Sequence, residues 1–288
     1  MPPCTASSVT ILSLAPHATK TFITFPWRVY RGDYLICTMI TALLWLPLLV
    51  QAESLAVDGH SPIPIPAASI DPVVDADALF SYGEDTARDL QALAILTRAL
   101  VTDMHNYQVL WRAARAYYQV GDEASDREKQ RYFEHGIEMG QRAVAQQPAG
   151  VEGHFWLAAN YGGLSAIQGI WRAFQMVKHV RAEMETALRL QPDYENGSAY
   201  RALGEISRQL PGVLGGNLKR AIAYFEQGLR VAPQNMGLKL ALAKAYLEAG
   251  QREASQRLLA EILQMPVRPA RVHADRRTQD KARQLLHK

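Results

Sequence analysis

The chain has 288 residues, of which 48% are hydrophobic and 20% charged, a balance that is ordinary for a folded protein and too apolar for a disordered one. The formal net charge is only +3, and residues 1–52 carry two of these charges, so the remainder is close to neutral. A near-neutral body argues against nucleic-acid binding, which requires a basic face that displaces counterions.

The N-terminal segment has the features of an export signal. The apolar, uncharged run over residues 35–50 is shorter than the about 20 residues that a membrane span needs, and Pro47 interrupts it. Two arginines precede the run, and a small residue ends it at Ala52. We expect residues 1–52 to be a signal peptide with a long n-region, cleaved after Ala52, so that the protein is periplasmic or otherwise exported. The alternatives are an uncleaved N-terminal membrane anchor and a buried helix.

The two cysteines, Cys4 and Cys37, both precede the expected cleavage point. The mature protein would therefore have no disulfide, no cysteine-ligated metal and no thiol nucleophile. Cys37 stands at the start of the apolar run and does not resemble a lipoprotein cleavage site. Residues 53–84 contain four prolines among small residues and show no helical period, so we expect an extended linker there.

The pattern over residues 85–266 is helical almost without interruption, and it repeats. Four predicted helices end at a proline, which lacks an N–H and clashes with the preceding turn. Small residues stand five and twelve positions before most of these prolines, where a neighbouring helix would approach closely. The four prolines are Pro148, Pro192, Pro233 and Pro266.

A partner helix precedes each of these four helices. In each partner a large residue is followed three or four positions later by a small one, which makes one apolar face with a notch for close packing. The partner segments are VLWRAARAYY, HFWLAANYGG, AYRALGEIS and LKLALAKAYL. Because such a helix pair cannot bury its face alone, the pairs should stack into a superhelix.

This spacing resembles the tetratricopeptide repeat, so we predict an all-α fold, a tetratricopeptide-like array of helical hairpins. The repeats are longer than usual, and we expect the extra residues in lengthened turns inside each hairpin. After the array, residues 267–288 carry an excess of basic residues. We expect a solvated, basic C-terminal helix and tail there, the alternative being attraction to an anionic membrane surface or an acidic partner.

A closer resemblance rests on three segments within residues 85–266: GHFWLAANYGGLSAIQGI, VRAEMETALRLQPDYENGSAYRALGEI and LPGVLGGNLKRAIAYFEQGLRVAP. They resemble the T-component family of TRAP transporters and are similar to the eukaryotic regulator-of-microtubule-dynamics proteins. The transporter resemblance implies a periplasmic protein that cooperates with a solute-binding protein, handles a small hydrophobic or organic-acid ligand, and can form homo-oligomers. Lipid anchoring, which occurs in that family, is not expected here because no lipobox cysteine is present.

Catalytic and metal-binding patterns are absent from the sequence. His135, His154 and His179 do not form a pair with metal-ligand spacing. The glycine-rich PGVLGG segment lacks the Gly-Lys-Ser/Thr ending of a phosphate loop, so it predicts a tight turn between two helices. We therefore expect no enzyme activity, no cofactor and no metal.

The candidate binding surface lies on the first helix of each pair. Its residues are one position further round the helix than the residues that pack in the core. Basic groups together with a tyrosine there would suit an anionic peptide segment or an organic acid, the alternative being a plain solvated face. These candidates are Arg112, Tyr161, Arg201, Glu205, Arg208 and Lys244. Among the aromatic residues, we expect Trp111, Trp156, Tyr200 and Phe225 in the core. Trp171 and Phe174 could line a hydrophobic pocket or cover a helix pair, and we favour covering.

The sequence thus indicates a non-enzymatic binding or scaffold protein with a protein partner, such as a periplasmic solute-binding protein. The alternative is a membrane-tethered tetratricopeptide assembly factor that recruits envelope proteins. The two hypotheses differ in whether residues 35–50 are removed or retained.

Overall fold

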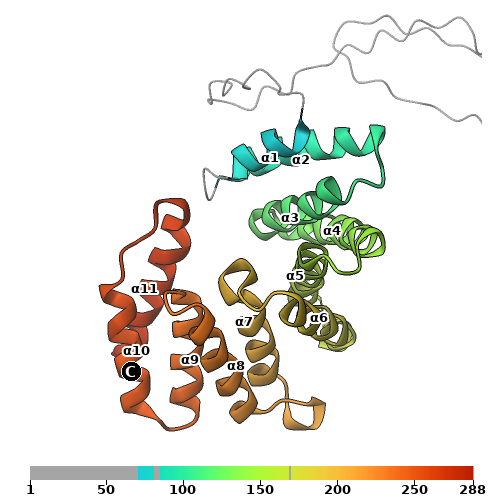
Figure 1. Cartoon of the computed structure of the whole chain (residues 1–288). Helices are drawn as coiled ribbons and strands as arrows, with labels where there is room; N and C mark the ends of the chain where they lie inside the picture. The colour runs from blue at the N-terminus through green and yellow to red at the C-terminus, as the bar shows by residue number, and fades with distance from the viewer. Residues whose placement is uncertain (1–70, 81–84, 169, 288) are drawn as a thin grey trace, which may run out of the picture. The chain divides into compact units, whose positions relative to one another are not determined.

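The computed structural model describes residues 71–80, 85–168 and 170–287, all within the compact unit that spans residues 63–288. This part of the chain is all-helical (Figure 1), as predicted. The expected signal peptide, its alternatives and residues 53–70 of the expected linker lie outside the described residues. None of the helices described is long and apolar enough to cross a membrane.

The described elements are eleven α-helices and two short 3-10 turns. In chain order they are α1 (Pro72–Phe80), α2 (Thr86–Thr102), α3 (Tyr107–Glu123), α4 (Asp126–Gln146), α5 (Val151–Ile167), α6 (Ile170–Leu190), α7 (Tyr194–Gln209), η1 (Gly212–Leu214), α8 (Leu218–Val231), α9 (Met236–Glu248), α10 (Arg252–Gln264), η2 (Pro269–Arg271) and α11 (Val272–Leu286).

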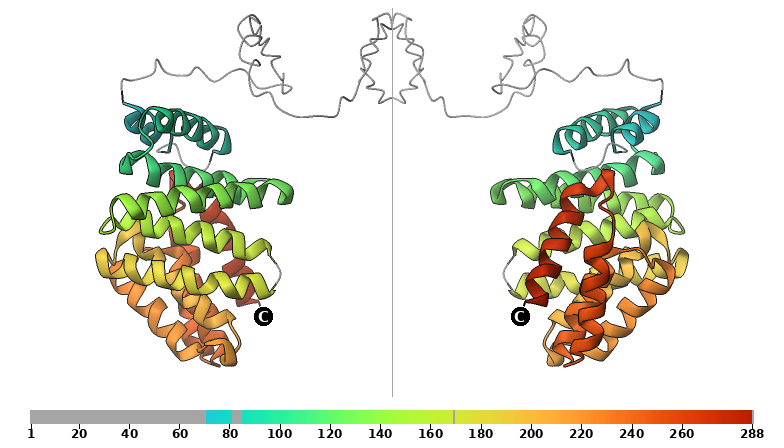
Figure 2. Two further views of the ribbon diagram at one scale, coloured as in Figure 1. Left: turned by 90° about the vertical axis from the view of Figure 1, so that its right-hand side faces the viewer. Right: turned by 90° about the vertical axis from the view of Figure 1, so that its left-hand side faces the viewer.

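Consecutive helices pack as hairpins, and each hairpin packs on the next (Figures 1 and 2). The hairpins are α1–α2, α3–α4, α5–α6, α7–α8 and α9–α10, and α11 follows as a helix packed on α10 and α9. The first helices of neighbouring hairpins also touch, because α1 contacts α3, α3 contacts α5, and α7 contacts α9. The predicted stacked array of helical hairpins is therefore confirmed.

Helix α1 lies inside the segment that we expected to be an extended linker. It packs on α2 and α3, and Ala76, Leu79 and Phe80 are buried. Pro72 is its first residue, a position where the missing N–H costs nothing because first-turn N–H groups have no partner within the helix. The linker prediction is wrong for residues 72–80, and the helical array begins before residue 85.

The predicted helix stops are confirmed. Helices α4, α6, α8 and α10 each end two residues before their proline. The small residues that precede these prolines lie at close helix contacts, as expected: a β-carbon added at Gly228 would lie 2.9 Å from the Leu238 side chain. Glu261 is the exception, because it is exposed and pairs with Lys239 across the α9–α10 hairpin (Nζ–Oε2, 2.6 Å).

The prediction that the extra residues lie in lengthened turns is confirmed for the α7–α8 hairpin and wrong for α3–α4 and α5–α6. In the α3–α4 and α5–α6 hairpins they lengthen the helices, since α4 and α6 have 21 residues each and the turns are short. In the α7–α8 hairpin they form a long turn over residues 210–217. The packing also changes at the α7–α8 hairpin. Helices α5 and α7 contact each other less than α3 and α5 do. The buried apolar residues of α8 and α9 form a core cluster separate from that of the preceding helices.

The C-terminal segment forms the expected helix, but one side of it is buried. Ala282 of α11 has no exposed surface, and Asp275 is 2% exposed. Arg268 donates two side-chain hydrogen bonds to Asp275 (2.9 and 2.6 Å), which hold the pKa of that carboxyl below its usual value. Residue Arg277 reaches Glu123 at the end of α3 (4.0 Å), so the end of the array lies beside its third helix.

Candidate binding surface

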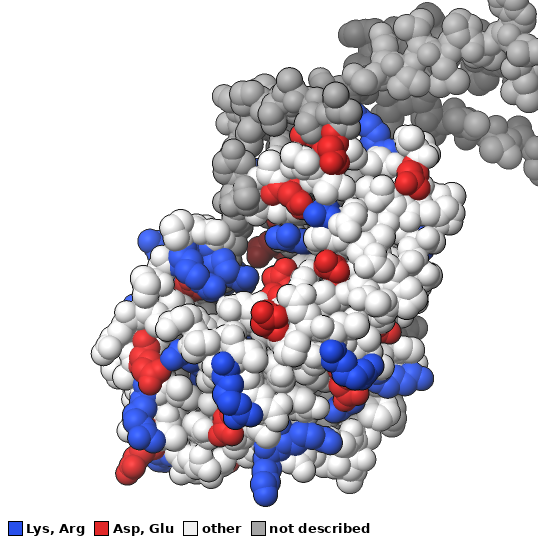
Figure 3. Space-filling model, viewed as in Figure 1, with Lys and Arg blue, Asp and Glu red and all other residues white. Residues whose placement is uncertain are grey.

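The candidate surface is the exposed side of the first helices of the hairpins, α3, α5, α7 and α9, which we call the inner face. In Figure 3 a hollow separates a group of Lys and Arg side chains from Asp and Glu side chains on its other side. Whether a charged residue of this face can bind a partner depends on what it already contacts. The six predicted residues divide clearly by this criterion.

Arg112 connects α3 to α1 through Asp77. Its Nε and Nη2 donate to the two carboxylate oxygens of Asp77 on α1, each at 2.7 Å, and Nη1 donates to Gln108. The guanidinium also lies 4.1 Å from the centre of the Trp111 ring. With its donors occupied in this way, Arg112 stabilises the first hairpin contact rather than offering a free cation.

Tyr161, Glu205 and Arg208 are likewise used within the array. The Tyr161 ring stacks on His179 at 5.1 Å, and its hydroxyl accepts a hydrogen bond from Gln141 (2.9 Å). Arg208 donates to Glu205 (Nη2–Oε2, 2.7 Å) on its own helix and to Glu248 on α9. These contacts connect α4, α5 and α6 in the first case and α7 and α9 in the second.

Arg201 and Lys244 remain available. Neither forms an ion pair with any residue in the described part of the chain. Arg201 is exposed, and its side chain lies over the first turn of α9, with Cδ 3.5 Å from where a β-carbon of Gly237 would stand. Lys244 is half-buried on α9. These two are the predicted residues that best fit a binding role.

Sequence reasoning missed a second group of residues, centred on Tyr118 of α3. Burial raises the pKa of the Tyr118 hydroxyl, Asp122 raises it further, and the positive charges of Arg201 and Arg271 lower it. The charges of both arginines thus act on one hydroxyl, although the two residues are far apart in the sequence. We call Tyr118, Asp122, Arg201 and Arg271 the Tyr118 cluster. Tyr118 and Asp122 share a helix face by their spacing, whereas nothing in the sequence indicates that Arg271 joins them.

Arg115 lies next to this cluster, one turn before Tyr118. Its guanidinium lies 4.4 Å from the centre of the Phe80 ring and 5.7 Å from that of Trp156. Its Nε is buried without a hydrogen-bond partner. Aromatic faces attract guanidinium groups, so these two rings hold the Arg115 side chain in place.

The described residues contain no group of three or more His, Cys, Asp or Glu side chains that could hold a metal ion. His154, which the sequence places among the isolated histidines, is buried between α5 and α6, where Nδ1 faces Glu183 at 2.5 Å and Nε2 faces the Pro148 carbonyl at 2.9 Å. Trp111, Trp156 and Phe225 are buried as expected, and Tyr200 is half-buried.

Comparisons with known proteins agree with the all-helical repeat fold. The tetratricopeptide repeat family matches residues 214–274. A solved structure, the tetratricopeptide protein TTC0263 of Thermus thermophilus, superposes with a TM-score of 0.56 at 20% identity, covering 75% of this chain and 98% of that one. The fold is a tetratricopeptide-repeat array. The structure of MamA is also similar, with a TM-score of 0.46 at 13% identity, covering 75% of this chain and 99% of that one.

A second match covers the N-terminal part of the tetratricopeptide-repeat array. The family described as regulator of microtubule dynamics protein 1-3 matches residues 73–205. Regulator of microtubule dynamics protein 2 of Mus musculus is 31% identical over 87 residues, which are 30% of this chain and 21% of that protein. The match thus spans about a fifth of the relative's length. The TRAP T-component part of the resemblance stays a prediction.

Proposed function

We propose that this protein is a non-catalytic scaffold whose inner face binds an anionic peptide segment of a partner protein. Arrays of this fold are protein-binding scaffolds. The observation that carries the proposal is that Arg201 and Lys244 of the inner face, together with Arg271, form no ion pair with a described residue. The charges of Arg201 and Arg271 also act on the same Tyr118 hydroxyl.

The chemistry of the cluster favours a carboxylate-bearing chain. Guanidinium groups bind carboxylates with two parallel hydrogen bonds. Asp122 belongs to the cluster and Glu123 follows it at the end of α3, so a basic residue of the same peptide would be accommodated next to the acidic one. Lys244 extends the positive surface along α9.

The test uses a fluorescein-labelled 12-residue peptide of alternating Glu and Ala, with a Lys and Ala peptide as the opposite-charge probe. Arg201→Ala and Arg271→Ala should each weaken binding of the acidic peptide in fluorescence anisotropy by about tenfold, because each removes a charge-assisted contact. Arg230→Ala is the matched control, because Arg230 is an exposed arginine on the second helix α8. Equal binding by all three variants would refute the proposal.

We also propose that the protein acts after export, with a periplasmic solute-binding protein as its partner. The apolar run over residues 35–50 and the resemblance to the TRAP T-component family support this. Sequencing the N-terminus of the protein expressed in a bacterium should give a mature chain that begins at Glu53. Retention of residues 35–50 would favour the membrane-tethered assembly factor instead. A purified TRAP solute-binding protein should bind the wild-type chain and lose binding to Arg201→Ala.

A further inference from the structure

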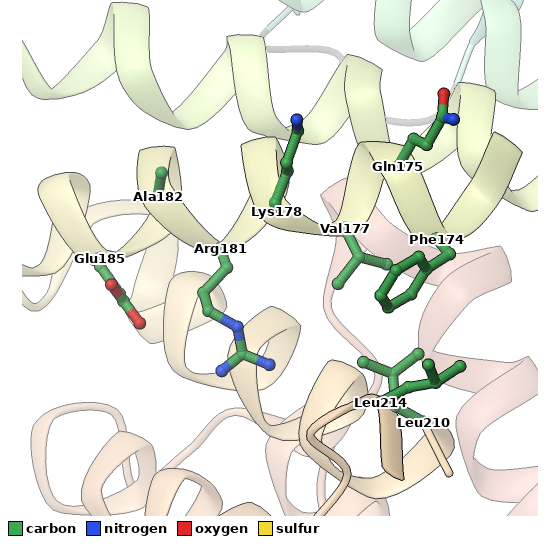
Figure 4. A pocket seen from close by; sticks show the side chains of 9 residues that line it. All are labelled: Phe174, Gln175, Val177, Lys178, Arg181, Ala182, Glu185, Leu210 and Leu214. Atoms are coloured by element: carbon green, nitrogen blue, oxygen red, sulfur yellow. The ribbon is translucent and has the colours of Figure 1, made fainter. Parts of the chain in front are cut away.

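A second surface, separate from the inner face, lies between α6 and the long turn of the α7–α8 hairpin. A groove of about 410 Å³ opens there, lined on one side by residues of α6 and on the other by Leu210 and Leu214. Figure 4 shows Phe174 and Val177 pointing toward these two leucines. Phe174, which we expected to cover a helix pair, is 40% exposed and lines the groove, and the side chain of Trp171 lies outside the described residues.

The turn that forms one wall of the groove is firmly built. The N–H groups of Leu214 and Gly216 donate to the Pro211 carbonyl at 2.9 and 3.0 Å, and Asn217 donates to the Ser207 carbonyl at 2.6 Å. Gly216 admits no side chain, because a β-carbon there would lie 1.7 Å from the Leu210 carbonyl oxygen. A turn held this closely fixes the positions of its side chains.

Yet this turn presents apolar side chains to solvent. Val213 is 94% exposed and Leu214 is 37% exposed. An exposed apolar cluster costs hydration free energy and favours self-association, so a rigid turn that displays one is typical of an interaction surface. The inserted residues lengthen the turn without adding to the core, since none of the residues of η1 is buried.

The charges around the groove indicate what it would bind. Arg181 extends beside the apolar side chains, and Lys178 stands at the other edge of α6 (Figure 4). Neither forms an ion pair with a residue that the structure describes. Glu185, one turn beyond Arg181, is the acidic residue of the lining. An apolar surface with two cations beside it is complementary to an amphipathic helix that carries acidic residues next to its apolar stripe.

We propose that the groove between α6 and the 210–217 turn docks an acidic amphipathic helix of a partner protein. Two or three apolar side chains of that helix would insert between Phe174 and Leu214, and its flanking carboxylates would pair with Arg181 and Lys178. This site is independent of the inner face, so a partner could engage both at once.

The probe is an 18-residue helical peptide with Leu at positions i, i+3, i+4 and i+7 and Glu on both flanks, and its twin has Lys in place of Glu. Leu214→Ser should weaken binding of the Glu peptide by about tenfold or more in fluorescence anisotropy. Val101→Ser is the matched control, since Val101 is 86% exposed on α2, and it should leave binding unchanged. Arg181→Glu should weaken the Glu peptide and strengthen the Lys twin.

The outcomes separate this site from its alternatives. Absence of Glu-peptide binding, or equal binding by Leu214→Ser and the control, would overturn the proposal. Binding of the chain to anionic phospholipid vesicles that is lost in Leu214→Ser, without peptide binding, would show a membrane contact in its place. Arg201→Ala should not change binding of the Leu-containing Glu peptide, and a change would assign the peptide to the inner face and overturn the groove assignment.

Discussion

The side chain of Asn160 on α5 occupies the space where a β-carbon at position 136 of α4 would stand. Its Oδ1 lies 1.9 Å from that position, so only glycine fits there. Asn160 has no exposed surface, and its Nδ2 donates to the carbonyls of Ala114 (2.9 Å) and Trp156 (2.8 Å). One buried amide thereby joins α3, α4 and α5.

Gly136→Ala should therefore destabilise the protein by about 2–3 kcal/mol, because the added methyl group must displace an amide that satisfies two buried carbonyls. Urea unfolding followed by circular dichroism measures this. Gly162→Ala is the control: Gly162 lies in α5 with nothing within 4 Å of the added carbon, so the same substitution should leave stability equal or higher. Equal losses in both variants would contradict the close-contact explanation.

Arg112→Lys should loosen α1 without affecting the inner face. Lysine keeps the charge but cannot make the paired hydrogen bonds that Arg112 donates to Asp77. Because the Asp77 side chain is 42% exposed, the coupling should be about 1 kcal/mol or less. Amide hydrogen exchange over residues 72–80 should become faster, while binding of the alternating Glu and Ala peptide should not change.

A double-mutant cycle with Asp77→Asn separates this coupling from a general loss of stability. In the Asp77→Asn background, Arg112→Lys should have little further effect on exchange over residues 72–80, because the paired hydrogen bonds are already broken. Additive effects of the two substitutions would show that Arg112 does not hold α1 through Asp77.

The helices were easier to predict from the sequence than the binding residues. A proline stop and a small residue at a close contact are local properties, so the ends of α4, α6, α8 and α10 follow from the chain. Helix α1 was not predicted because prolines also occur in linkers. In the sequence, a proline at the first position of a helix cannot be distinguished from a proline in a linker.

The binding surface depends on which partner each charged side chain finds in space. Arg112 and Arg201 have equivalent positions in the repeat pattern. Arg112 forms an ion pair with Asp77, whereas Arg201 forms no ion pair with a described carboxylate. The effect of Arg271 on the Tyr118 hydroxyl follows from the stacking of the hairpins and the position of α11. Neither fact is encoded in local spacing.

His154→Phe should destabilise the α5–α6 hairpin. Both ring nitrogens of His154 face oxygen atoms, Glu183 at Nδ1 and the Pro148 carbonyl at Nε2, so the ring bridges two polar groups in a buried place. Phenylalanine would leave the Glu183 carboxylate, whose side chain is 24% exposed, without its partner. We expect a loss of about 1–3 kcal/mol in urea unfolding.

Adding Glu183→Leu to His154→Phe gives the matching test. Replacing both members of this partly buried polar pair with apolar groups removes the unpaired carboxylate, so the double variant should recover part of the lost stability. If the double variant is less stable than His154→Phe alone, packing rather than the polar pair determines the cost.

Asp89 on α2 gives the protein a pH-dependent stability. Burial raises the pKa of this carboxyl from 3.8 to about 6. The charge of Arg115 lowers the pKa, and the charges of Asp85 and Glu123 raise it. Between about pH 4 and 6 the folded chain therefore holds a proton at Asp89 that the unfolded chain has lost. Stability contributed by this residue must fall as the pH rises through this range, because the unfolded state then binds fewer protons than the folded state.

Asp89→Asn should remove this dependence, since an amide cannot ionise. The variant and the wild type should have similar unfolding free energies near pH 4, and the variant should be more stable by on the order of 1–2 kcal/mol at pH 7. Urea unfolding at pH 4, 5, 6 and 7 measures the difference. Asp280→Asn on α11, where the side chain is 63% exposed, is the control, and its difference from wild type should change little with pH. If the unfolding free energies of Asp89→Asn and the wild type differ by the same amount at every pH, the Asp89 carboxyl has the same pKa in the folded and unfolded states. Burial then does not raise the pKa.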